Sequence, residues 1–167
     1  MQERPRIAKL AVEHEVVNFD CGQEELNLFI KRYALTGQRA NISRTYVAVQ
    51  GVRIVGYHTL AVGSVLYQDA PERLGKGIPK HPIPVLLLAR LAVDKTWQGR
   101  GLGAALVVDA IRRTLQAADI AGARALLIHA KDEEARDFYM HLGFEPFTGD
   151  PFVLYRLLKD IRAMVKS

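Results

Sequence analysis

The chain has 167 residues, of which 49% are hydrophobic and 25% are charged, and its net charge is +5. This balance predicts a single folded domain over residues 1–167 and excludes a disordered or fibrous chain. No apolar run reaches the roughly 20 residues of a membrane span, and Cys21 is the only cysteine, so we expect a cytoplasmic protein with no membrane attachment and no internal disulfide.

The first half of the chain predicts a helix followed by a hairpin. Residues 23–35 have helical spacing, and four residues form the expected inner face: Leu26, Phe29, Ile30 and Tyr33. Residues 45–49 and 54–65 are predicted strands, joined at Gln50-Gly51. The proline-containing stretch 68–84 is expected to be an exposed loop.

The second half predicts strands alternating with helices. Residues 84–93 are strongly apolar and predict a strand buried on both faces. A helix to about residue 118 follows, and its expected inner face is formed by Ala105, Val108, Ile111, Arg112 and Leu115.

The last part of the chain predicts two more strands and two helices. Residues 125–130 form a predicted strand, after which Asp132 is expected to cap a short helix that ends at Gly143. Residues 152–157 predict a last strand before a helical tail. The fold class is therefore α/β (α+β), with a mixed, mainly antiparallel sheet flanked by helices.

A glycine-rich turn separates the predicted strand 84–93 from the helix after it. Gly99, Gly101 and Gly103 alternate at the mouth of this helix. Backbone N–H groups at a helix start, together with the helix dipole, attract anions. The turn therefore predicts a phosphate-binding site.

Two common phosphate motifs fit the turn poorly. A P-loop requires Gly-Lys-Ser/Thr, which does not follow these glycines. The dinucleotide pattern is formally met by Gly99-x-Gly101-x-x-Ala104, with Asp132 as a ribose-binding acid. However, residues 94–98 separate the strand from the first glycine, and too few residues follow the motif for a doubly wound sheet.

A third pattern, Gln98-x-x-Gly101-x-Gly103, resembles the acetyl-CoA pyrophosphate loop of the GCN5-related N-acetyltransferases. Residues 135–144, with the sequence ARDFYMHLGF, resemble a second signature of that family, A-x-x-F-Y-x-x-x-G-F. The resemblance spans roughly residues 45–157 and implies a sheet splayed at an acetyl-CoA site. The residues implied to bind acetyl-CoA are Leu91, Ala92, Val93, Gln98, Gly99, Arg100, Gly101, Leu102, Gly103, Ala104, Asp132, Ala135 and Phe138.

Residues 19–30, 43–47, 90–94 and 130–133 resemble the acetyltransferase toxins of type II toxin–antitoxin systems. This resemblance implies acetylation of the α-amino group of aminoacyl-tRNA, which blocks translation. It also implies a ribbon-helix-helix antitoxin as partner, and a homodimer.

The distribution of charge supports an RNA substrate independently. Residues 26–68 contain five basic residues and no acid, and residues 26–93 contain nine basic residues and two acids. Such a stretch is typical of a polyanion-binding face, although an ordinary solvated surface is the alternative. The candidate tRNA-binding residues are Lys31, Arg32, Arg39, Arg44, Lys76, Lys80 and Arg90. Arg90, amid an apolar strand, would alternatively pair with a buried carboxylate.

The resemblance implies that Tyr139 lies beside the pyrophosphate loop, and Tyr139 is the candidate general acid because a phenol can give a proton to the departing thiolate. The alternative role for Tyr139 is a packed aromatic residue. The sequence indicates no obvious general base, which favours an α-amine acceptor, although a water chain or Asp94 would also serve. The five histidines have no metal-ligand spacing, so we expect no metal.

Two other functions remain open at this stage. One is acetylation of a small amine or a protein N-terminus, and the other is acetyl-CoA binding without catalysis.

Overall fold

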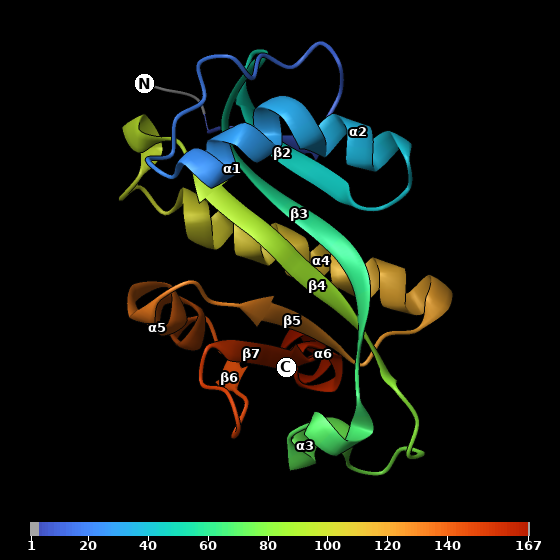
Figure 1. The fold of residues 1–167 in the computed structure, drawn as a ribbon. Coiled ribbons are helices and arrows are strands. Elements are labelled where there is room, and N and C mark those ends of the chain that lie inside the picture. Colours follow the sequence, from blue (N-terminus) through green and yellow to red (C-terminus); the bar gives the residue numbers. More distant parts are fainter. Residues whose placement is uncertain (1–3, 167) are drawn as a thin grey trace. The chain divides into compact units, whose positions relative to one another are not determined.

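The computed structural model describes residues 4–166, which fall into two compact units (Figure 1). The first unit comprises the chain up to Ala61 together with Ala89–Ala110, and the second comprises Val62–Leu88 and the chain from Ile111. The strands of the described residues form a seven-stranded sheet with the order β1-β2-β3-β4-β5-β7-β6. Strands β3 and β4 and helix α4 contribute to both units.

The N-terminal part of the first unit contains two strands and one long, irregular helix. Strand β1 (Arg6–Lys9) precedes α1 (Glu24–Leu28), the π-helical segment η1 (Phe29–Tyr33) and α2 (Ala34–Arg39). These last three follow one another without a break, so the predicted helix is longer than expected and contains a π turn. Of its predicted inner face, Ile30 is buried but Tyr33 is 55% exposed.

Strands β2 (Arg44–Gln50) and β3 (Arg53–Val65) form the predicted hairpin. Gly51 in the connection has φ +63°, a conformation that favours glycine. Strand β1 pairs with β2 in antiparallel fashion and was not predicted. It is only four residues long, with neither end residue buried, and so it has a weak hydrophobic pattern.

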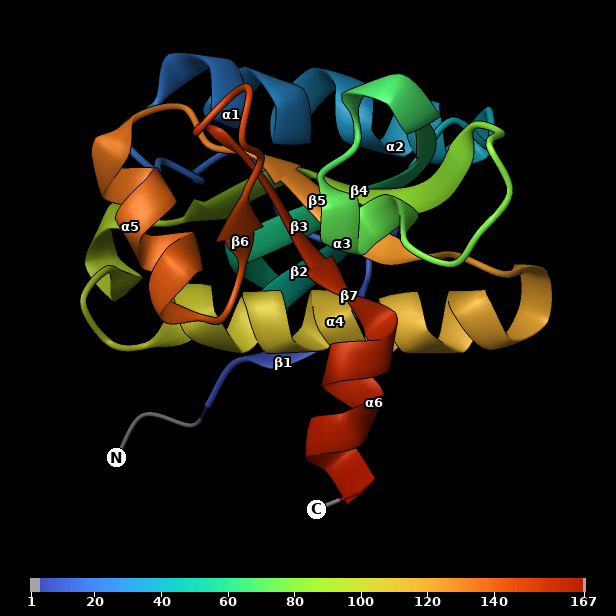
Figure 2. The ribbon, with the colours of Figure 1, turned by 90° about the horizontal axis from the view of Figure 1, so that it is seen from below.

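The first unit has a layer of helix on each face of its strands (Figures 1 and 2). Ile30 and Ala34 pack with Val47, Val49 and Tyr57 on the face covered by α1, η1 and α2. On the opposite face, α4 (Leu102–Ala121) begins with Leu102 and Leu106, which pack with Ala48 and Val55. Alternate residues of β2 therefore serve two separate cores.

The predicted inner face of α4 is mostly wrong: of its five residues Ile111 is buried and Leu115 half-buried, but the other three are exposed. Ala105 is exposed and Val108 is 43% exposed, whereas Leu106, Val107 and Ala110 are fully buried. Apolar residues lie on almost every side of this helix, so spacing alone could not identify the side that packs on the strands.

The second unit contains the remaining strands of the sheet. Strand β4 (Ile83–Val93) pairs in parallel with β5 (Ala125–His129), and β5 pairs antiparallel with β7 (Val153–Leu157). The short strand β6 (Glu145–Pro146) pairs with β7 and was not predicted. The sheet is therefore mixed and mainly antiparallel, as predicted.

Short helical segments complete the described chain. These are η2 (Tyr67–Asp69), α3 (Glu72–Gly75), η3 (Lys95–Trp97), α5 (Glu133–His141) and α6 (Leu158–Lys166). Stretch 68–84 is thus not simply an exposed loop, since Leu74 of α3 is fully buried against Val65, Ile83 and Leu157. Within the described residues, no helix is long and apolar enough to cross a membrane.

Strand β4 is not buried on both faces as predicted. Val85, Leu88 and Ala92 are buried, whereas Ala89 is exposed and Arg90 is half-buried. The exposed side borders a groove of the first unit.

The packing of α4 predicts unequal effects for two neighbouring truncations. Leu106→Ala removes a fully buried side chain and is expected to lower the free energy of unfolding by about 2–5 kcal/mol. Val108→Ala is the control, with an expected effect of at most about 0.5 kcal/mol. Urea unfolding followed by circular dichroism measures both, and similar losses would contradict this orientation of α4.

Candidate functional site

The glycine turn connects β4 to α4 within the first unit. Gly99 has φ +78° and Gly101 has φ +83°, so both positions require the left-handed backbone that glycine adopts without strain. Residues 98–101 are exposed. A Cβ built at either glycine would meet no atom within 4 Å, which leaves room for a ligand directly above the backbone.

Helix α4 begins immediately after this turn, at Leu102. The N–H groups in the first turn of a helix have no partner within the helix. In α4 the hydrogen bond from the Ala105 N–H to the Gly101 carbonyl, at 3.1 Å, comes only after this first turn. Leu102 itself is buried, while Gly103 and Ala104 are half-buried. The turn therefore presents main-chain donors and the positive end of a 20-residue helix to an anion.

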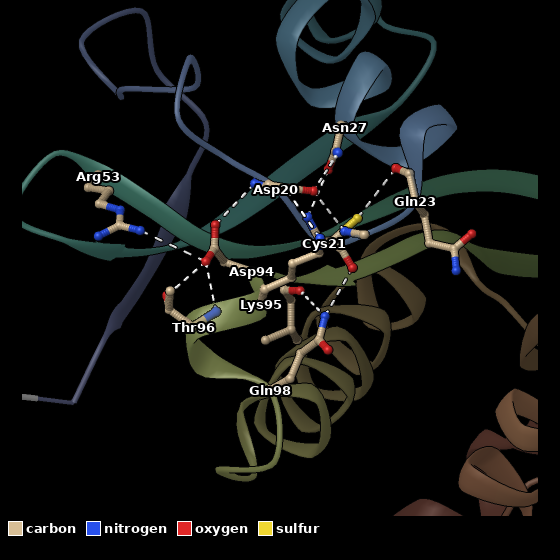
Figure 3. A network of polar contacts seen from close by, with 11 residues as sticks. Asp20, Cys21, Gln23, Asn27, Arg53, Asp94, Lys95, Thr96 and Gln98 are labelled. Atoms are coloured by element: carbon tan, nitrogen blue, oxygen red, sulfur yellow. Dashed lines mark hydrogen bonds and ion pairs between the residues drawn. The ribbon is translucent and has the colours of Figure 1, made fainter.

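Gln98 holds the turn in place through main-chain oxygens (Figure 3). Its side-chain Nε2 donates to the carbonyl of Val93 at 2.9 Å and to the carbonyl of Cys21 at 3.0 Å. The side-chain amide is thus used inside the protein, which leaves the backbone of Gln98 for a ligand.

Asp94 lies directly after β4 and is 3% exposed. Its carboxylate accepts hydrogen bonds from the Thr96 N–H at 3.0 Å, the Thr96 hydroxyl at 2.7 Å and the Asp20 N–H at 3.0 Å. The guanidinium of Arg53 lies 3.8 Å from the same carboxylate. Asp94 therefore joins the segment before α1 to the segment before the glycine turn.

These contacts determine the charge of Asp94. Burial alone would raise the pKa of this carboxyl, but the hydrogen bonds from Thr96 and Asp20 and the charge of Arg53 outweigh burial and lower the pKa below its ordinary value. An enclosed carboxylate with a lowered pKa and three donors is a poor proton acceptor. These contacts give Asp94 a structural role and disfavour it as a general base.

The segment joined to Asp94 continues the same network. One oxygen of Asp20 accepts from the Gly22 N–H at 2.9 Å and from the Asn27 side chain at 3.0 Å. The Asn27 carbonyl oxygen in turn accepts from the Cys21 N–H at 2.9 Å. Asn27 is buried on α1, so the start of this helix is fixed to the turn through Asp20 and Asp94.

The end of β4 supplies the three predicted residues that precede Asp94. Ala92 is buried with Ile30 and Tyr57, whereas Leu91 and Val93 pack on the opposite face with Leu102 and Leu106. Beyond the turn, the Arg100 guanidinium lies 4.6 Å from the centre of the Trp97 ring.

The second unit holds the other predicted residues on α5. The Asp132 carboxylate accepts from the Ala135 N–H at 2.8 Å, which is the predicted helix cap. The helix ends before Gly143, whose φ is +96°. The carboxylate of Asp132 and the N–H of Ala135 are therefore paired with each other.

Tyr139 is buried on α5 between two other aromatic rings. The centre of its ring lies 5.1 Å from that of Phe138 and 5.9 Å from that of Phe144. Burial raises the pKa of Tyr139 above its ordinary value, which keeps the hydroxyl protonated at neutral pH. This hydroxyl makes no hydrogen bond to any residue that the structure describes, yet it is not enclosed. It is thus a proton-bearing group available to an external partner.

The predicted tRNA-binding residues are divided between the units. Lys31, Arg32 and Arg39 are exposed on η1 and α2, and none of them forms an ion pair with another described residue. Lys76 and Lys80 are exposed in the second unit.

The other two candidates have contacts inside the first unit. The Arg44 guanidinium donates to the Gln38 carbonyl at 2.9 Å and to the Asn41 side chain at 2.8 Å, near the end of α2. Arg90 lies over the Phe29 ring, 4.0 Å from its centre, rather than against a buried carboxylate.

Sequence reasoning did not place Asp20 or Asn27 in the site, although both lie in the segment 19–30 that resembles the toxins. Asp20 is separated from Asp94 by 74 positions, so no local pattern links them. In the described part of the chain, no three histidine, cysteine or acidic side chains are grouped as metal ligands.

Comparison with known proteins agrees with this geometry. The model of the acetyltransferase (GNAT) domain family matches residues 41–146. The chain is 46% identical over 151 residues to a tRNA-acetylating toxin of Mycobacterium tuberculosis (strain ATCC 25618 / H37Rv), and this match covers 90% of each chain.

Two solved structures are also similar to the chain. AtaT complexed with acetyl-methionyl-tRNAfMet has a TM-score of 0.90 at 32% identity, covering 96% of this chain and 98% of that one. A tyrosine-to-phenylalanine mutant of AtaT, bound to the C-terminus of the antitoxin AtaR and to acetyl-CoA, has a TM-score of 0.83 at 29% identity, covering 97% and 98%.

The contacts of Asp94 predict a pH-dependent loss of stability on substitution. Asp94→Asn removes one acceptor oxygen and the charge opposite Arg53, and is expected to lower the free energy of unfolding at pH 7 by about 1–3 kcal/mol. Because the pKa is lowered in the folded state, the contribution of Asp94 is present above the unfolded pKa of about 3.9 and is lost as pH falls through the folded value.

Urea unfolding of both proteins between pH 7 and pH 3 measures this difference. Asp137→Asn, at an exposed position of α5, is the control and should match the wild type. A stability difference that does not narrow below about pH 4 would contradict the assignment.

Proposed function

The chain belongs to the GNAT acetyltransferase family and is an acetyl-CoA-dependent N-acetyltransferase, and from this premise we propose that its acceptor is the α-amino group of an amino acid carried on tRNA. Acetylation of this amino group prevents the use of the amino acid in translation. We therefore propose that the protein is a toxin, which acts in the cytoplasm as a single catalytic domain over residues 1–167.

One observation carries the choice of acceptor. Residues 26–68 contain no acid, and the first unit exposes Lys31, Arg32 and Arg39 from this stretch without an ion pair among the described residues. An RNA backbone needs such unneutralised charge, whereas a small amine does not. The relatives named as tRNA-acetylating toxin and as AtaT with acetyl-methionyl-tRNAfMet support the same choice.

The glycine turn fits the pyrophosphate of acetyl-CoA. We assign to it the backbone from Gln98 to Ala104, with Leu91, Ala92 and Val93 along the pantetheine arm and Arg100 as added positive charge. Asp132, Ala135 and Phe138 complete the assigned contacts. Acetyl-CoA supplies a thioester, whose carbonyl carbon is the site of attack by the acceptor amine.

Tyr139 is the proposed general acid. Its hydroxyl holds a proton at neutral pH and has no hydrogen bond among the described residues, so it can give this proton to the departing thiolate. No base is assigned, because an α-amine with a pKa near 8 is partly neutral at physiological pH. The carboxylate of Asp94 is already used by Thr96 and Asp20.

We also propose two protein partners. One is an antitoxin with a ribbon-helix-helix DNA-binding part, by analogy with AtaT bound to the C-terminus of AtaR. The other is a second copy of the chain, since a homodimer would extend the positive surface. Coexpression with the neighbouring reading frame and light scattering of the purified protein test these two partners.

Radiolabelled acetyl-CoA tests the acceptor directly. The purified protein is incubated with aminoacyl-tRNA, deacylated tRNA, free amino acids and a peptide with a free N-terminus. Label on aminoacyl-tRNA alone is expected. Label on the peptide or the free amines would favour the small-amine or N-terminal acetyltransferase, and no label on any acceptor would favour an acetyl-CoA-binding module without catalysis.

Removal of the Tyr139 hydroxyl is expected to lower the rate of the chemical step. Tyr139→Phe should reduce kcat about 100-fold with little change in KM for acetyl-CoA, since the ring packing is retained. Steady-state kinetics of aminoacyl-tRNA acetylation measure this change, and Phe144→Leu, at the other ring packed on Tyr139, is a packing control. In cells, Tyr139→Phe should relieve growth arrest.

The pH dependence of the rate distinguishes the titration of Tyr139, the proposed acid, from that of the acceptor amine. The rate should rise from pH 6 towards pH 8.5 as the α-amine loses its proton, and it should not fall by pH 9, because burial raises the pKa of Tyr139 above its ordinary value of 10.0. A fall in kcat between pH 7 and pH 9 would contradict Tyr139 as the acid.

Removal of basic charge is expected to weaken the binding of the RNA substrate only. Alanine at Lys31, Arg32 and Arg39 together should raise KM for aminoacyl-tRNA and lower the salt dependence of binding by about one unit for each lost phosphate contact. KM for acetyl-CoA should not change. Arg112→Ala, at an exposed position of α4, is the matched control. Equally weakened binding of aminoacyl-tRNA and acetyl-CoA would indicate damaged folding instead.

A further inference from the structure

A groove of about 420 Å³ lies in the first unit, apart from the glycine turn. Its walls come from η1, α2, the turn that follows α2, β3 and β4. Its larger lining residues include Phe29, Tyr33 and Arg90. Apart from Arg90, no charged residue lines it.

Small side chains create this groove. Gly37 and Ala40 lie on the helical wall, and Ala61 and Ala89 lie on the strands. Thr59 adds a hydroxyl that is already hydrogen-bonded to Thr45 at 2.8 Å. The wall is therefore mostly apolar, with enough space for a planar group.

The π-helical segment η1 places an aromatic ring at the groove. Ile30 is 3% exposed and Ala34 is fully buried, whereas Tyr33, the neighbour of Ala34, lines the groove and is 55% exposed. A π turn weakens a helix and is found frequently at functional sites. Here it directs a large ring outward on a helix that otherwise packs on the sheet.

Arg90 provides a fixed positive charge at the same groove. Its guanidinium is half-buried and lies 4.0 Å from the centre of the Phe29 ring, a cation–π contact that holds it in position. Arg90 forms no ion pair with any residue in the described part of the chain. The groove therefore combines an exposed aromatic ring with a charge that an anion would neutralise.

We propose that this groove binds the 3′-terminal nucleotide of the tRNA, with its base stacked on Tyr33 and its phosphate held by Arg90. This inference rests on the proposed function. Single-stranded RNA ends are recognised in this way, by aromatic stacking beside basic residues. Lys31 and Arg32, exposed on the same η1 segment, continue the positive charge toward the preceding phosphates.

Binding to two RNAs tests the assignment without catalysis. Deacylated tRNA with its complete 3′ end is compared with the same tRNA lacking the terminal adenosine, by fluorescence anisotropy. The wild type should prefer the complete RNA about tenfold, and Tyr33→Ala should abolish this preference, since one stacked base contributes a factor of that size. Tyr33→Phe should keep the preference, and Arg90→Gln should reduce it, because the shortened RNA lacks the phosphate assigned to Arg90.

Controls separate this result from folding damage and from failure of the proposed function. Ile120→Ala, at a position 88% exposed, should behave as the wild type, and KM for acetyl-CoA should be unchanged in every variant. If the wild type prefers the complete RNA but acetylates no aminoacyl-tRNA, the proposed function fails while the groove assignment stands.

One result would overturn the assignment itself: a Tyr33→Ala protein that retains the wild-type preference for the complete RNA. If that protein also loses binding of the cognate antitoxin, the groove is assigned to the antitoxin instead.

Discussion

The carboxylate of Asp94 is the contact on which the arrangement of the first unit depends. It binds the main chain at Thr96, which leads into the glycine turn, and the main chain at Asp20, which leads into α1. The segment that leads into the glycine turn and the segment that leads into the helix with the basic residues are thus fixed by one buried group. The strand β3 contributes as well, through Arg53 opposite the same carboxylate.

Local signals were sufficient for much of the fold. The hairpin at Gly51, the capping of α5 by Asp132 and the glycine turn depend on neighbouring residues, and the structure has each of them where it was predicted. The order of strands and helices followed from hydrophobic patterns of ordinary length. The short strands β1 and β6 have too few residues to produce such a pattern.

Contacts between distant segments could not be predicted in this way. The hydrogen bond from Asp20 to Asp94 and the stacking of Arg90 on Phe29 join segments far apart in the sequence. The predicted inner face of α4 was mostly wrong for a related reason, because its apolar residues surround the helix and only the neighbouring strands select one side. Likewise, the buried Leu74 made an apparent loop part of a core.

The hydrogen bonds of Gln98 bear on which sequences can build this turn. Both of its acceptors are main-chain carbonyls, at Cys21 and Val93, so this contact places no demand on the side chains at those two positions. The whole requirement falls on position 98, which must carry a long side chain with N–H donors. Glutamine and arginine meet it, whereas glutamate has only acceptors and leucine has neither. The glutamine that opens the pattern Gln98-x-x-Gly101-x-Gly103 thus has a chemical basis, and positions 21 and 93 are free to vary as far as this contact is concerned.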